Sequence, residues 1–265
     1  MDRRAEGRKV KMSDPRLSII SERLRDIGDI IAVSSGKGGV GKSLIASALA
    51  LTLTEKKYKV GLLDLDFTSP STHVILDAGE AHPTEWKGII PPEIHGIKYM
   101  SIIYFSGNRA LPLRGLEASN ALIELLAITR WGQLDYLIVD MPPGIGDATL
   151  DVIKLMKRVR FLLVVTPSKL AFETAKKLID LLLELNVPIV GVIENMKMGE
   201  STFIRERIRE TGLKYLGEIP FDHALEEAIG DPNRFSKTIF AESVRKILKM
   251  NDYLKGSLVL EPRNL

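Results

Sequence analysis

Short apolar runs alternate with longer amphipathic segments along most of the 265-residue chain. The short runs lack the regular polar alternation of half-exposed strands, which is typical of strands buried on both faces of a parallel sheet. The longer segments repeat apolar residues every three or four positions, which favours helices that cover such a sheet. The predicted strands lie at residues 30–34, 60–64, 97–103, 137–140, 161–165, 189–194 and 215–219. The predicted helices lie at residues 42–55, 117–128, 172–185, 203–210, 224–229 and 239–249.

A helix start signal precedes the first predicted strand. Residues 13–15 read Ser-Asp-Pro, and apolar residues then recur at helical spacing. These apolar residues are Leu17, Ile20, Leu24 and Ile27. We expect a short amphipathic helix here, whose apolar face either packs on the core or docks a partner.

Two segments depart from the alternation. Residues 1–12 carry many basic and few apolar side chains, which predicts a disordered basic tail, with an arm that binds nucleic acid as the alternative. Residues 77–96 contain three prolines and predict an irregular excursion. Residues 13–265 show no linker and no internal repeat. We therefore predict a single α/β domain with a doubly wound, mostly parallel sheet and helices on both faces.

Charge and residue usage exclude several classes of protein. The 37 basic and 34 acidic residues leave a net charge of +3, which is too balanced for a dedicated nucleic-acid-binding protein. The sequence contains no cysteine, which excludes disulfides, thiolate catalysis and cysteine-ligated zinc or iron–sulfur sites within these residues. His73, His82, His95 and His223 show no metal-ligand spacing. Neither a signal peptide nor an apolar run near the roughly 20 residues of a membrane span is visible, so we expect a cytoplasmic protein without a membrane partner.

A glycine-rich loop with two lysines joins the first predicted strand to a helix. Its glycines allow successive backbone N–H groups to point inward at phosphate oxygens, and the N-terminus of the following helix adds a favourable dipole. We expect Lys42 to contact the β- and γ-phosphates of a nucleotide and Ser43 to place its hydroxyl on Mg²⁺. The alternative, a flexible loop without a ligand, does not explain the lysine, the serine and both flanks together. The expected nucleotide-binding residues of this segment are Gly36, Lys37, Gly38, Gly39, Val40, Gly41, Lys42, Ser43 and Leu44.

Carboxylates end two further predicted strands. Asp64 and Asp66 have the i, i+2 spacing that places two side chains on one side of a strand. Asp140 ends the strand at residues 137–140, and Gly144 follows in a Pro-Pro-Gly turn. Carboxylates at this edge of a parallel sheet lie where α/β proteins bind ligands, and buried ones are costly unless Mg²⁺ or a water uses them. We expect Asp140 to enter the Mg²⁺ shell and the unobstructed N–H of Gly144 to face the γ-phosphate. Solvated strand-end acids are the alternative for Asp64 and Asp66.

The loop sequence Gly-Lys-Gly-Gly-Val-Gly-Lys-Ser resembles the deviant Walker A motif of the MinD, ParA and nitrogenase iron-protein superfamily. The resemblance implies an ATPase that binds ATP or ADP with Mg²⁺ and forms a homodimer on ATP, in which Lys37 reaches the partner's nucleotide. It also implies catalytic roles for Lys37, Lys42 and Asp66. In this family pattern, Asp66 orients the attacking water and Asp64 supports the metal region. Leu44 stands where the superfamily usually has a threonine that contacts the α-phosphate.

Further segments resemble the Mrp branch of this superfamily, and the resemblance extends over residues 29–248. The resembling segments are 113–115, 131–132, 140–147, 166–168 and 192–196. The same resemblance implies adenine recognition by Asn195, whose amide matches the donor and acceptor pattern of adenine, with Pro220 and Asp222 at the end of the next strand. A strand-end turn is the alternative role for Asn195.

Mrp proteins generally carry a Cys-x-x-Cys pair shortly after a Glu-Asn-Met sequence, and a dimer uses the pair to hold a bridging iron–sulfur cluster. Residues 197–203 occupy this position here and read Lys-Met-Gly-Glu-Ser-Thr-Phe. The sequence most resembles the archaeal Mrp-type HypB ATPases, at residues 63–67, 73–76, 91–92, 95–98 and 128–131. That resemblance implies nickel insertion during [NiFe]-hydrogenase maturation, with a HypA-type nickel chaperone as partner. The alternatives are a cysteine-free accessory of iron–sulfur assembly and a MinD- or ParA-like positioning ATPase.

Overall fold

The computed structural model describes residues 14–107 and 113–250. The predicted basic tail at residues 1–12 and the end of the predicted domain at residues 251–265 lie outside the described residues. Within them the chain forms an eight-stranded sheet and a separate two-stranded hairpin.

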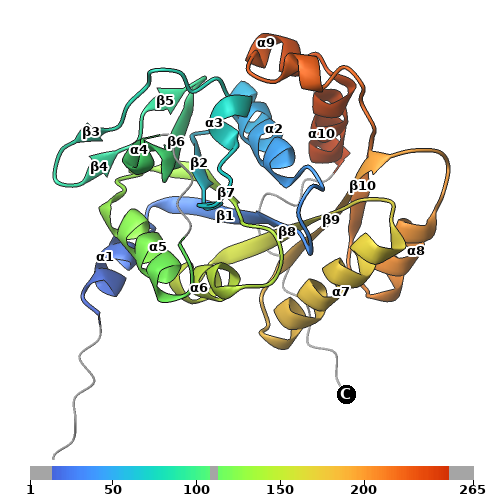
Figure 1. Cartoon of the computed structure of the whole chain (residues 1–265), viewed down its shortest axis with the longest axis horizontal. Coiled ribbons are helices and arrows are strands. Elements are labelled where there is room, and N and C mark those ends of the chain that lie inside the picture. Colours follow the sequence, from blue (N-terminus) through green and yellow to red (C-terminus); the bar gives the residue numbers. More distant parts are fainter. Residues whose placement is uncertain (1–13, 108–112, 251–265) are drawn as a thin grey trace, which may run out of the picture.

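The strands of the sheet follow the order β10-β9-β8-β1-β7-β2-β6-β5 (Figure 1). Neighbouring strands are parallel except at one edge, where β5 and β6 are antiparallel. Strands that precede β8 in the chain lie on one side of β1, and β8 to β10 lie on the other. The connections therefore diverge at the carboxyl end of β1, which is the position where doubly wound sheets bind ligands. The strands are β1 (Ile27–Ser34), β2 (Val60–Asp64), β5 (Glu93–Ile94), β6 (Ile97–Ser101), β7 (Leu134–Asp140), β8 (Val159–Val165), β9 (Ile189–Lys197) and β10 (Tyr215–Pro220).

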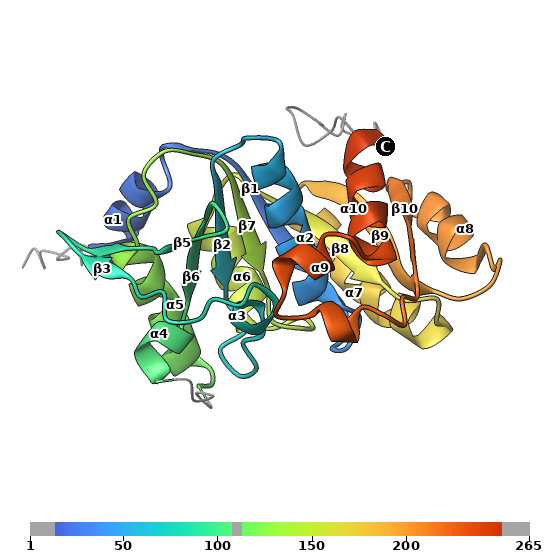
Figure 2. The same cartoon turned by 90° about the horizontal axis from the view of Figure 1, so that it is seen from above.

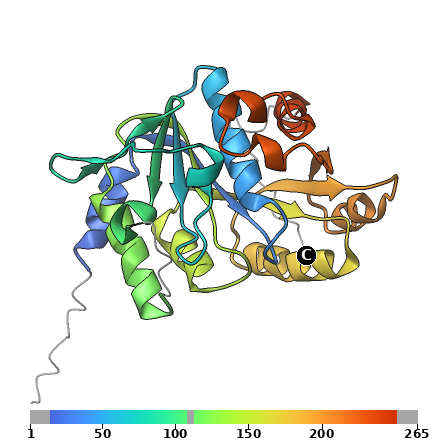
Figure 3. The same ribbon diagram turned by 45° about the horizontal axis from the view of Figure 1, so that its top comes forward.

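Helices cover both faces of the sheet, which gives the three layers seen in Figure 3. One layer consists of α2 (Lys42–Glu55), α3 (Thr72–Ile75), the 3₁₀ turn η1 (Glu226–Ala228), α9 (Pro232–Phe235) and α10 (Ile239–Met250). The other layer consists of α1 (Arg16–Arg23), α5 (Leu116–Ile128), α6 (Asp147–Leu155), α7 (Lys169–Glu184) and α8 (Phe203–Glu210). A short helix, α4 (Ile103–Ser106), follows β6. This arrangement confirms the predicted doubly wound α/β fold.

Strand β1 shows why the apolar runs form central strands. Successive side chains of a strand point to opposite faces. Ile30 and Ala32 pack against the layer that contains α5 to α8, whereas Ile31 and Val33 pack against the layer that contains α2 and α10. All four are buried. Each large aliphatic side chain contributes about 1.5–3 kcal/mol through burial, so a continuous apolar run is stable only between two helical layers.

The seven predicted strands are all found, as β1, β2, β6, β7, β8, β9 and β10. The strand predicted at residues 97–103 ends earlier, at Ser101, because Ile103 begins α4. The helix predicted at residues 224–229 is reduced to η1, after which Ile229 is extended and Gly230 has a positive φ. Helix α9 was not predicted, although it begins with an N-capping Asp231 and a proline at its first position, which are ordinary start signals.

The helix predicted near Leu17, Ile20 and Leu24 is α1. Ile20 and Leu24 are buried in the core cluster that includes α5, and Leu17 is partly buried against it. The suggestion that this apolar face docks a partner is therefore wrong, and core packing is its role. Ile27 belongs to β1 rather than to the helix.

The predicted irregular excursion at residues 77–96 contains more structure than expected. It includes the antiparallel hairpin of β3 (Thr84–Glu85) and β4 (Ile89–Ile90), followed by β5. The hairpin projects beyond the β5 edge of the sheet, next to α1 (Figures 1 and 2). Pro91 and Pro92 come before Glu93, the first residue of β5, so they do not interrupt the pairing of β5 with β6.

Candidate nucleotide-binding site

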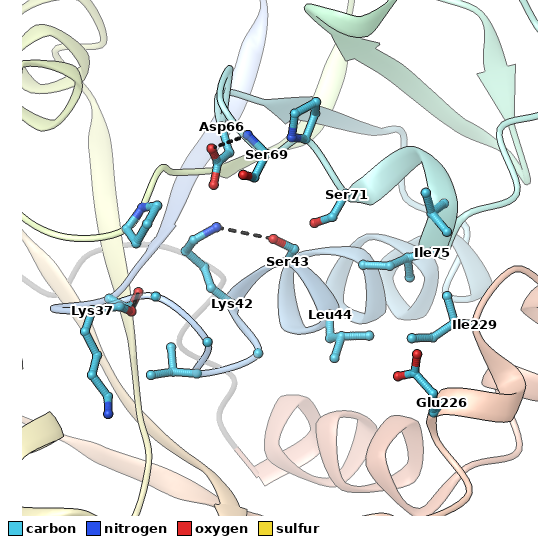
Figure 4. Close-up of a pocket in the computed structure, with 18 residues that line it drawn as sticks. Lys37, Lys42, Ser43, Leu44, Asp66, Ser69, Ser71, Ile75, Glu226 and Ile229 are labelled. Atoms are coloured by element: carbon cyan, nitrogen blue, oxygen red, sulfur yellow. Dashed lines mark hydrogen bonds between the residues drawn. The ribbon is translucent and has the colours of Figure 1, made fainter. Parts of the chain in front are cut away.

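A cavity of about 440 Å³ lies at the carboxyl edge of the sheet, over the first turns of α2 (Figure 4). The loop between β1 and α2 forms one wall, and the segment after β2 forms the opposite wall. The volume falls within the usual range of small-molecule sites. The lining residues are Ser35, Lys37, Gly38, Gly39, Val40, Gly41, Lys42, Ser43, Leu44, Asp66, Ser69, Pro70, Ser71, Val74, Ile75, Pro143, Glu226 and Ile229.

Lys42 and Asp140 form a buried ion pair at the floor of this site. The Lys42 ammonium lies 2.6 Å from Oδ1 of Asp140 and also donates a hydrogen bond of 3.3 Å to Oγ of Ser43. Lys42 is 7% exposed and Asp140 is fully buried. Oδ2 of Asp140 is buried and has no hydrogen-bond partner among the described residues. This oxygen, next to the Ser43 hydroxyl, fits a Mg²⁺ ion, which binds one or two protein oxygens and takes its other ligands from water and phosphate.

Burial raises the pKa of Asp140 to about 6. Lys42 acts in the opposite direction, and the neighbouring carboxylate of Asp64 adds to the increase. Asp64 pairs with Asp140 in the register of β2 and β7, which explains their proximity. Burial also raises the pKa of Asp64.

Asp64 is placed where it supports the segment next to the predicted metal region, and direct contact of Asp64 with Mg²⁺ stays a prediction. Its Oδ2 accepts hydrogen bonds from the hydroxyl of Thr72, at 2.6 Å, and from the Thr72 N–H. Its Oδ1 accepts a bond from the backbone N–H of Asp66. Asp64 is fully buried and does not line the cavity. Both oxygens therefore hold the segment between β2 and α3 in place.

Asp66 does line the cavity, as predicted for a residue that acts on a ligand. Its Oδ1 accepts hydrogen bonds from the Thr68 hydroxyl at 2.9 Å and from the Ser69 N–H at 3.0 Å, the second of which is drawn in Figure 4. These bonds orient the carboxylate and leave Oδ2 without a hydrogen-bond partner in residues 14–107 and 113–250.

The side chain of Lys37 points away from Lys42, Ser43 and Asp66 (Figure 4). Its ammonium forms no ion pair and no hydrogen bond within the described part of the chain. Only its backbone is fixed, since its carbonyl accepts a bond of 2.8 Å from the Ser35 hydroxyl. Lys37 is thus not placed to act on a nucleotide bound in its own cavity.

Two glycines predicted to contact phosphate make close contacts within the protein. A Cβ at Gly36 would overlap the backbone of Thr174 and Ala175, so this position is restricted by the close approach of α7. The N–H of Gly144 already donates a 2.9 Å bond to the Ser35 carbonyl, and Gly144 does not line the cavity. In this conformation the N–H predicted to face the γ-phosphate is not available to a ligand.

The residues predicted to recognise adenine lie outside the cavity. Asn195 is buried, and its amide nitrogen donates a 2.9 Å bond to the Val40 carbonyl, which holds the glycine-rich loop. Asp222 accepts bonds from the N–H groups of Ala224 and Phe240 and so supports the turn and the start of α10. Pro220 ends β10 and is exposed. Asn195 and Asp222 therefore make structural contacts in this conformation, and contact of the three residues with a base stays a prediction.

Other residues line the end of the cavity that is distant from Asp66. Glu226 of η1 and Ile229 face Leu44 and Ile75 there (Figure 4). Sequence reasoning missed Glu226 and Ile229 because they are far along the chain and carry no motif. The segment Ser69-Pro70-Ser71 was also missed, although its position directly after Asp66 is a signal that could have identified it.

The parallel sheet, the glycine-rich loop between β1 and α2, and the acidic ends of β2 and β7 define a P-loop nucleotide-binding protein of the MinD and ParA type. Over residues 26–251 the sequence matches the ParA family described as NUBPL iron-transfer P-loop NTPase, and the chain belongs to this family.

Known proteins similar to this chain include iron–sulfur carriers. An iron–sulfur cluster carrier protein of Aquifex aeolicus is 37% identical over 222 residues, which cover 78% of this chain and 61% of that protein. The chain therefore spans less than two thirds of that relative. The structure of a nucleotide-binding protein from Archaeoglobus fulgidus in complex with ADP is 32% identical, with a TM-score of 0.70, and the match covers 83% of this chain and 93% of that one. The septum site-determining protein MinD of Pyrococcus horikoshii, complexed with Mg-ADP, shares the fold at 22% identity, with a TM-score of 0.65 and coverage of 86% and 98%.

Neither a metal-binding cluster nor a membrane-spanning helix is present among the described residues. No group of three or more histidine, cysteine, aspartate or glutamate side chains is placed to hold a metal ion there. In residues 14–107 and 113–250, no helix has the length and apolar character needed to cross a membrane.

Proposed function

We propose that this chain is a Mg²⁺-dependent ATPase that dimerises on ATP and serves iron–sulfur cluster assembly as a cysteine-free accessory. The observation that best supports the ATPase is the buried pair of Lys42 and Asp140 beside Ser43, with Oδ2 of Asp140 left without a protein partner. An uncompensated carboxylate oxygen in a buried place is costly, which favours a site built for a ligand.

Lys42 changes partner when a triphosphate enters the cavity. In the present conformation its charge is balanced by Asp140. A phosphate group supplies the negative charge that allows Lys42 to leave Asp140 without becoming a bare buried cation. The exchange frees both oxygens of Asp140. Ser43 and Asp140 would then hold Mg²⁺, which supplies neutralisation of phosphate charge when bound.

Asp66 is the residue proposed to orient the attacking water. It lines the cavity opposite Lys42 and Ser43, and its two hydrogen bonds to Thr68 and Ser69 fix its direction. Phosphoryl transfer depends mainly on positioning and on charge stabilisation, so a fixed acceptor for a water proton is sufficient for slow hydrolysis.

Lys37 is proposed to act on the nucleotide of a second copy of the chain. Its side chain points out of its own cavity and has no partner within the described ranges. An outward cation beside a phosphate site can complete the site of a dimer partner, as arginine fingers do in other phosphoryl-transfer proteins.

The proposed cargo follows from the relatives and from the lack of thiolates. The Aquifex relative is named an iron–sulfur cluster carrier, whereas this sequence has no cysteine to ligate a cluster. We therefore place the cluster on a partner protein and give this chain the role of ATP-dependent accessory.

The loop between β9 and α8 supports this division of roles. Lys197, the last residue of β9, donates hydrogen bonds to both oxygens of the buried Glu194, at 3.1 and 3.2 Å. It also donates to the Ser201 carbonyl. Tyr215 donates a 2.8 Å bond to the same Glu194. Lys197 thus links the loop, through the Ser201 carbonyl, to the buried carboxylate of Glu194 in β9.

Nickel insertion with a HypA-type partner is the competing function, and a MinD- or ParA-like positioning role is a further one. The resemblance to HypB rests on the sequence segments given above, and the names of the relatives concern iron–sulfur clusters rather than nickel. The comparisons thus favour the iron–sulfur alternative.

Cluster transfer tests the proposal. A cluster-loaded scaffold protein and an apo-ferredoxin are mixed with the chain, with or without Mg·ATP, and ferredoxin absorbance is followed. We expect ATP to accelerate transfer with the wild-type chain and with Lys177→Ala, an exposed substitution, but not with Lys42→Ala. Absence of acceleration by ATP would contradict the iron–sulfur role. ATP-dependent stimulation of nickel insertion into an apo-hydrogenase subunit would then favour the competing function.

A further inference from the structure

The tip of the β3–β4 hairpin carries an exposed tryptophan surrounded by cations. Trp86 is 57% exposed, and the hairpin holds it beyond the β5 edge of the sheet (Figures 1 and 2). The Arg130 guanidinium lies 4.4 Å from the centre of the indole, and the Lys87 ammonium lies 5.2 Å from it. Arg23 also reaches the tip, where it donates a 3.1 Å bond to the Lys87 carbonyl. We call Trp86, Lys87, Arg23 and Arg130 the Trp86 tip.

The tip is held in one orientation by its backbone. Arg130 donates a 2.9 Å side-chain bond to the Trp86 carbonyl, and its own N–H donates to the Ile89 carbonyl at 2.7 Å. The Trp86 N–H donates a 2.8 Å hydrogen bond to the Gly88 carbonyl, which closes the turn. Lys87 has a φ of 50°, a left-handed conformation that is uncommon for a non-glycine residue. A turn whose backbone is already fixed loses little conformational entropy on binding, which favours an anchoring role for the tryptophan that it carries.

The charge of the tip is not neutralised within the chain. No carboxylate lies within ion-pair distance of Arg23, Lys87 or Arg130 in the part of the chain that the structure describes. The hydrogen bonds of the two arginines go to backbone carbonyls, which leaves their net charge in place. Each guanidinium has donors beyond those used in these bonds. The tip therefore combines an apolar platform with three cationic groups.

We propose that the Trp86 tip docks an acidic segment of a partner protein that places an apolar residue against the indole and its carboxylates against Arg23, Lys87 and Arg130. The tip carries three cations next to one acidic sequence neighbour, Glu85, and the whole sequence has a net charge of only +3. Such a local cluster matches a few carboxylates, whereas a nucleic acid requires contacts along several successive phosphates. The glycine-rich loop lies at the centre of the sheet and the hairpin at its β5 edge, so this docking is separate from ATP hydrolysis.

Two variants of the tip and one matched control test the proposal. The probe is a fluorescein-labelled peptide of alternating glutamate and leucine, and its anisotropy is titrated with the full chain. Trp86→Ala should weaken binding roughly tenfold or more, the scale of an interfacial tryptophan. Lys87→Glu should weaken it severalfold at low salt, with a smaller difference at high salt because exposed charges are screened. Lys237→Glu makes the same charge change at an exposed lysine before α10 and should bind like wild type.

Two further readouts separate docking from a folding defect. The sequence contains two tryptophans, and Trp131 is fully buried, so a change in intrinsic emission on peptide addition reports Trp86. ATP hydrolysis by Trp86→Ala and Lys87→Glu should equal that of wild type, which also makes this test independent of the proposed ATPase. Equal peptide binding by all variants, or none by wild type, would overturn the proposal. Trp86-dependent binding of anionic vesicles or single-stranded DNA in place of the peptide would also overturn it.

Discussion

The Lys42 ammonium lies 2.6 Å from Oδ1 of Asp140, and both groups are buried at the carboxyl edge of the sheet. The second oxygen of Asp140 has no hydrogen-bond partner in the described residues. A buried pair that is only half satisfied is a poor source of stability, since its desolvation is compensated incompletely. The pair is better explained by a role in ligand binding than by a contribution to stability.

This pair makes the stability of the nucleotide-free protein depend on pH. The pKa of Asp140 is about 6 in the folded chain and about 3.9 in an unfolded one. Between these values the folded state binds more protons than the unfolded state, so the free energy of unfolding falls as the pH rises from about 4 to about 6. Asp64, whose pKa is also raised, acts in the same direction.

Asp140→Asn removes the contribution of Asp140 to this trend. Urea unfolding across the pH range should show wild type losing stability relative to the variant as the pH rises, by on the order of 1–3 kcal/mol, since one pKa unit corresponds to about 1.4 kcal/mol. A difference between the two proteins that is flat or that increases with pH would show that Asp140 is not desolvated as described.

Two glycines of the loop should respond differently to a methyl group. Gly36→Ala forces a Cβ into the backbone of α7, so we expect a loss of roughly 1–3 kcal/mol in the free energy of unfolding. Gly38→Ala meets only Pro143 side-chain atoms at 3.8 Å, which is ordinary contact, and should stay within about 0.5 kcal/mol of wild type. Urea midpoints at one pH compare them, and equal stability of the two variants would contradict the packing of Gly36 against α7.

Lys37 should affect ATP hydrolysis only when two copies of the chain form a dimer. Because its side chain has no partner in the described ranges, Lys37→Ala should fold and bind Mg·ATP normally. It should lose about 10³-fold or more in hydrolysis if it completes the site of a second copy. Light scattering with a non-hydrolysable ATP analogue measures the mass of the complex. A mass that is the same with and without nucleotide would contradict ATP-driven dimerisation.

The buried ion pair of Lys197 and Glu194 in β9 should contribute strongly to the stability of the fold. Lys197 and Glu194 are both buried, so Lys197→Met leaves an unpaired buried carboxylate and should cost about 3–5 kcal/mol. Adding Glu194→Gln should recover part of this loss. Lys176→Met removes an exposed pair with Asp180 and should change stability by less than about 1 kcal/mol. Similar urea midpoints for Lys197→Met and Lys176→Met would show that the buried pair of β9 stabilises the fold no more than an exposed pair does.

The strands and the glycine-rich loop could be predicted because they depend on local patterns. Ile30 to Val33 are apolar on both faces, and Lys42 and Ser43 follow the loop at fixed spacing. The sequence does not show which atoms meet across the fold.

The contacts of individual site residues depend on distances between elements that are remote in sequence. Asn195 contacts Val40 because β9 ends beside the glycine-rich loop, and Glu226 reaches the cavity because the chain returns over α2 after β10. Asp64 accepts a hydrogen bond from the Thr72 hydroxyl because α3, which begins at Thr72, starts close to the end of β2. No motif encodes these relationships, so they required the structure.

Release of phosphate from ATP is the most direct test of the central claim that the Lys42–Asp140 pair marks the reaction centre. Wild type, Lys42→Ala and the exposed control Lys177→Ala are compared with Mg²⁺ and with a chelator, after binding of nucleotide has been measured for each. We expect slow hydrolysis that requires Mg²⁺ in wild type and in the control, and a loss of about 10²-fold or more in Lys42→Ala, the scale of removing one preorganised charge from a transition state. Hydrolysis by Lys42→Ala at the wild-type rate would contradict the account.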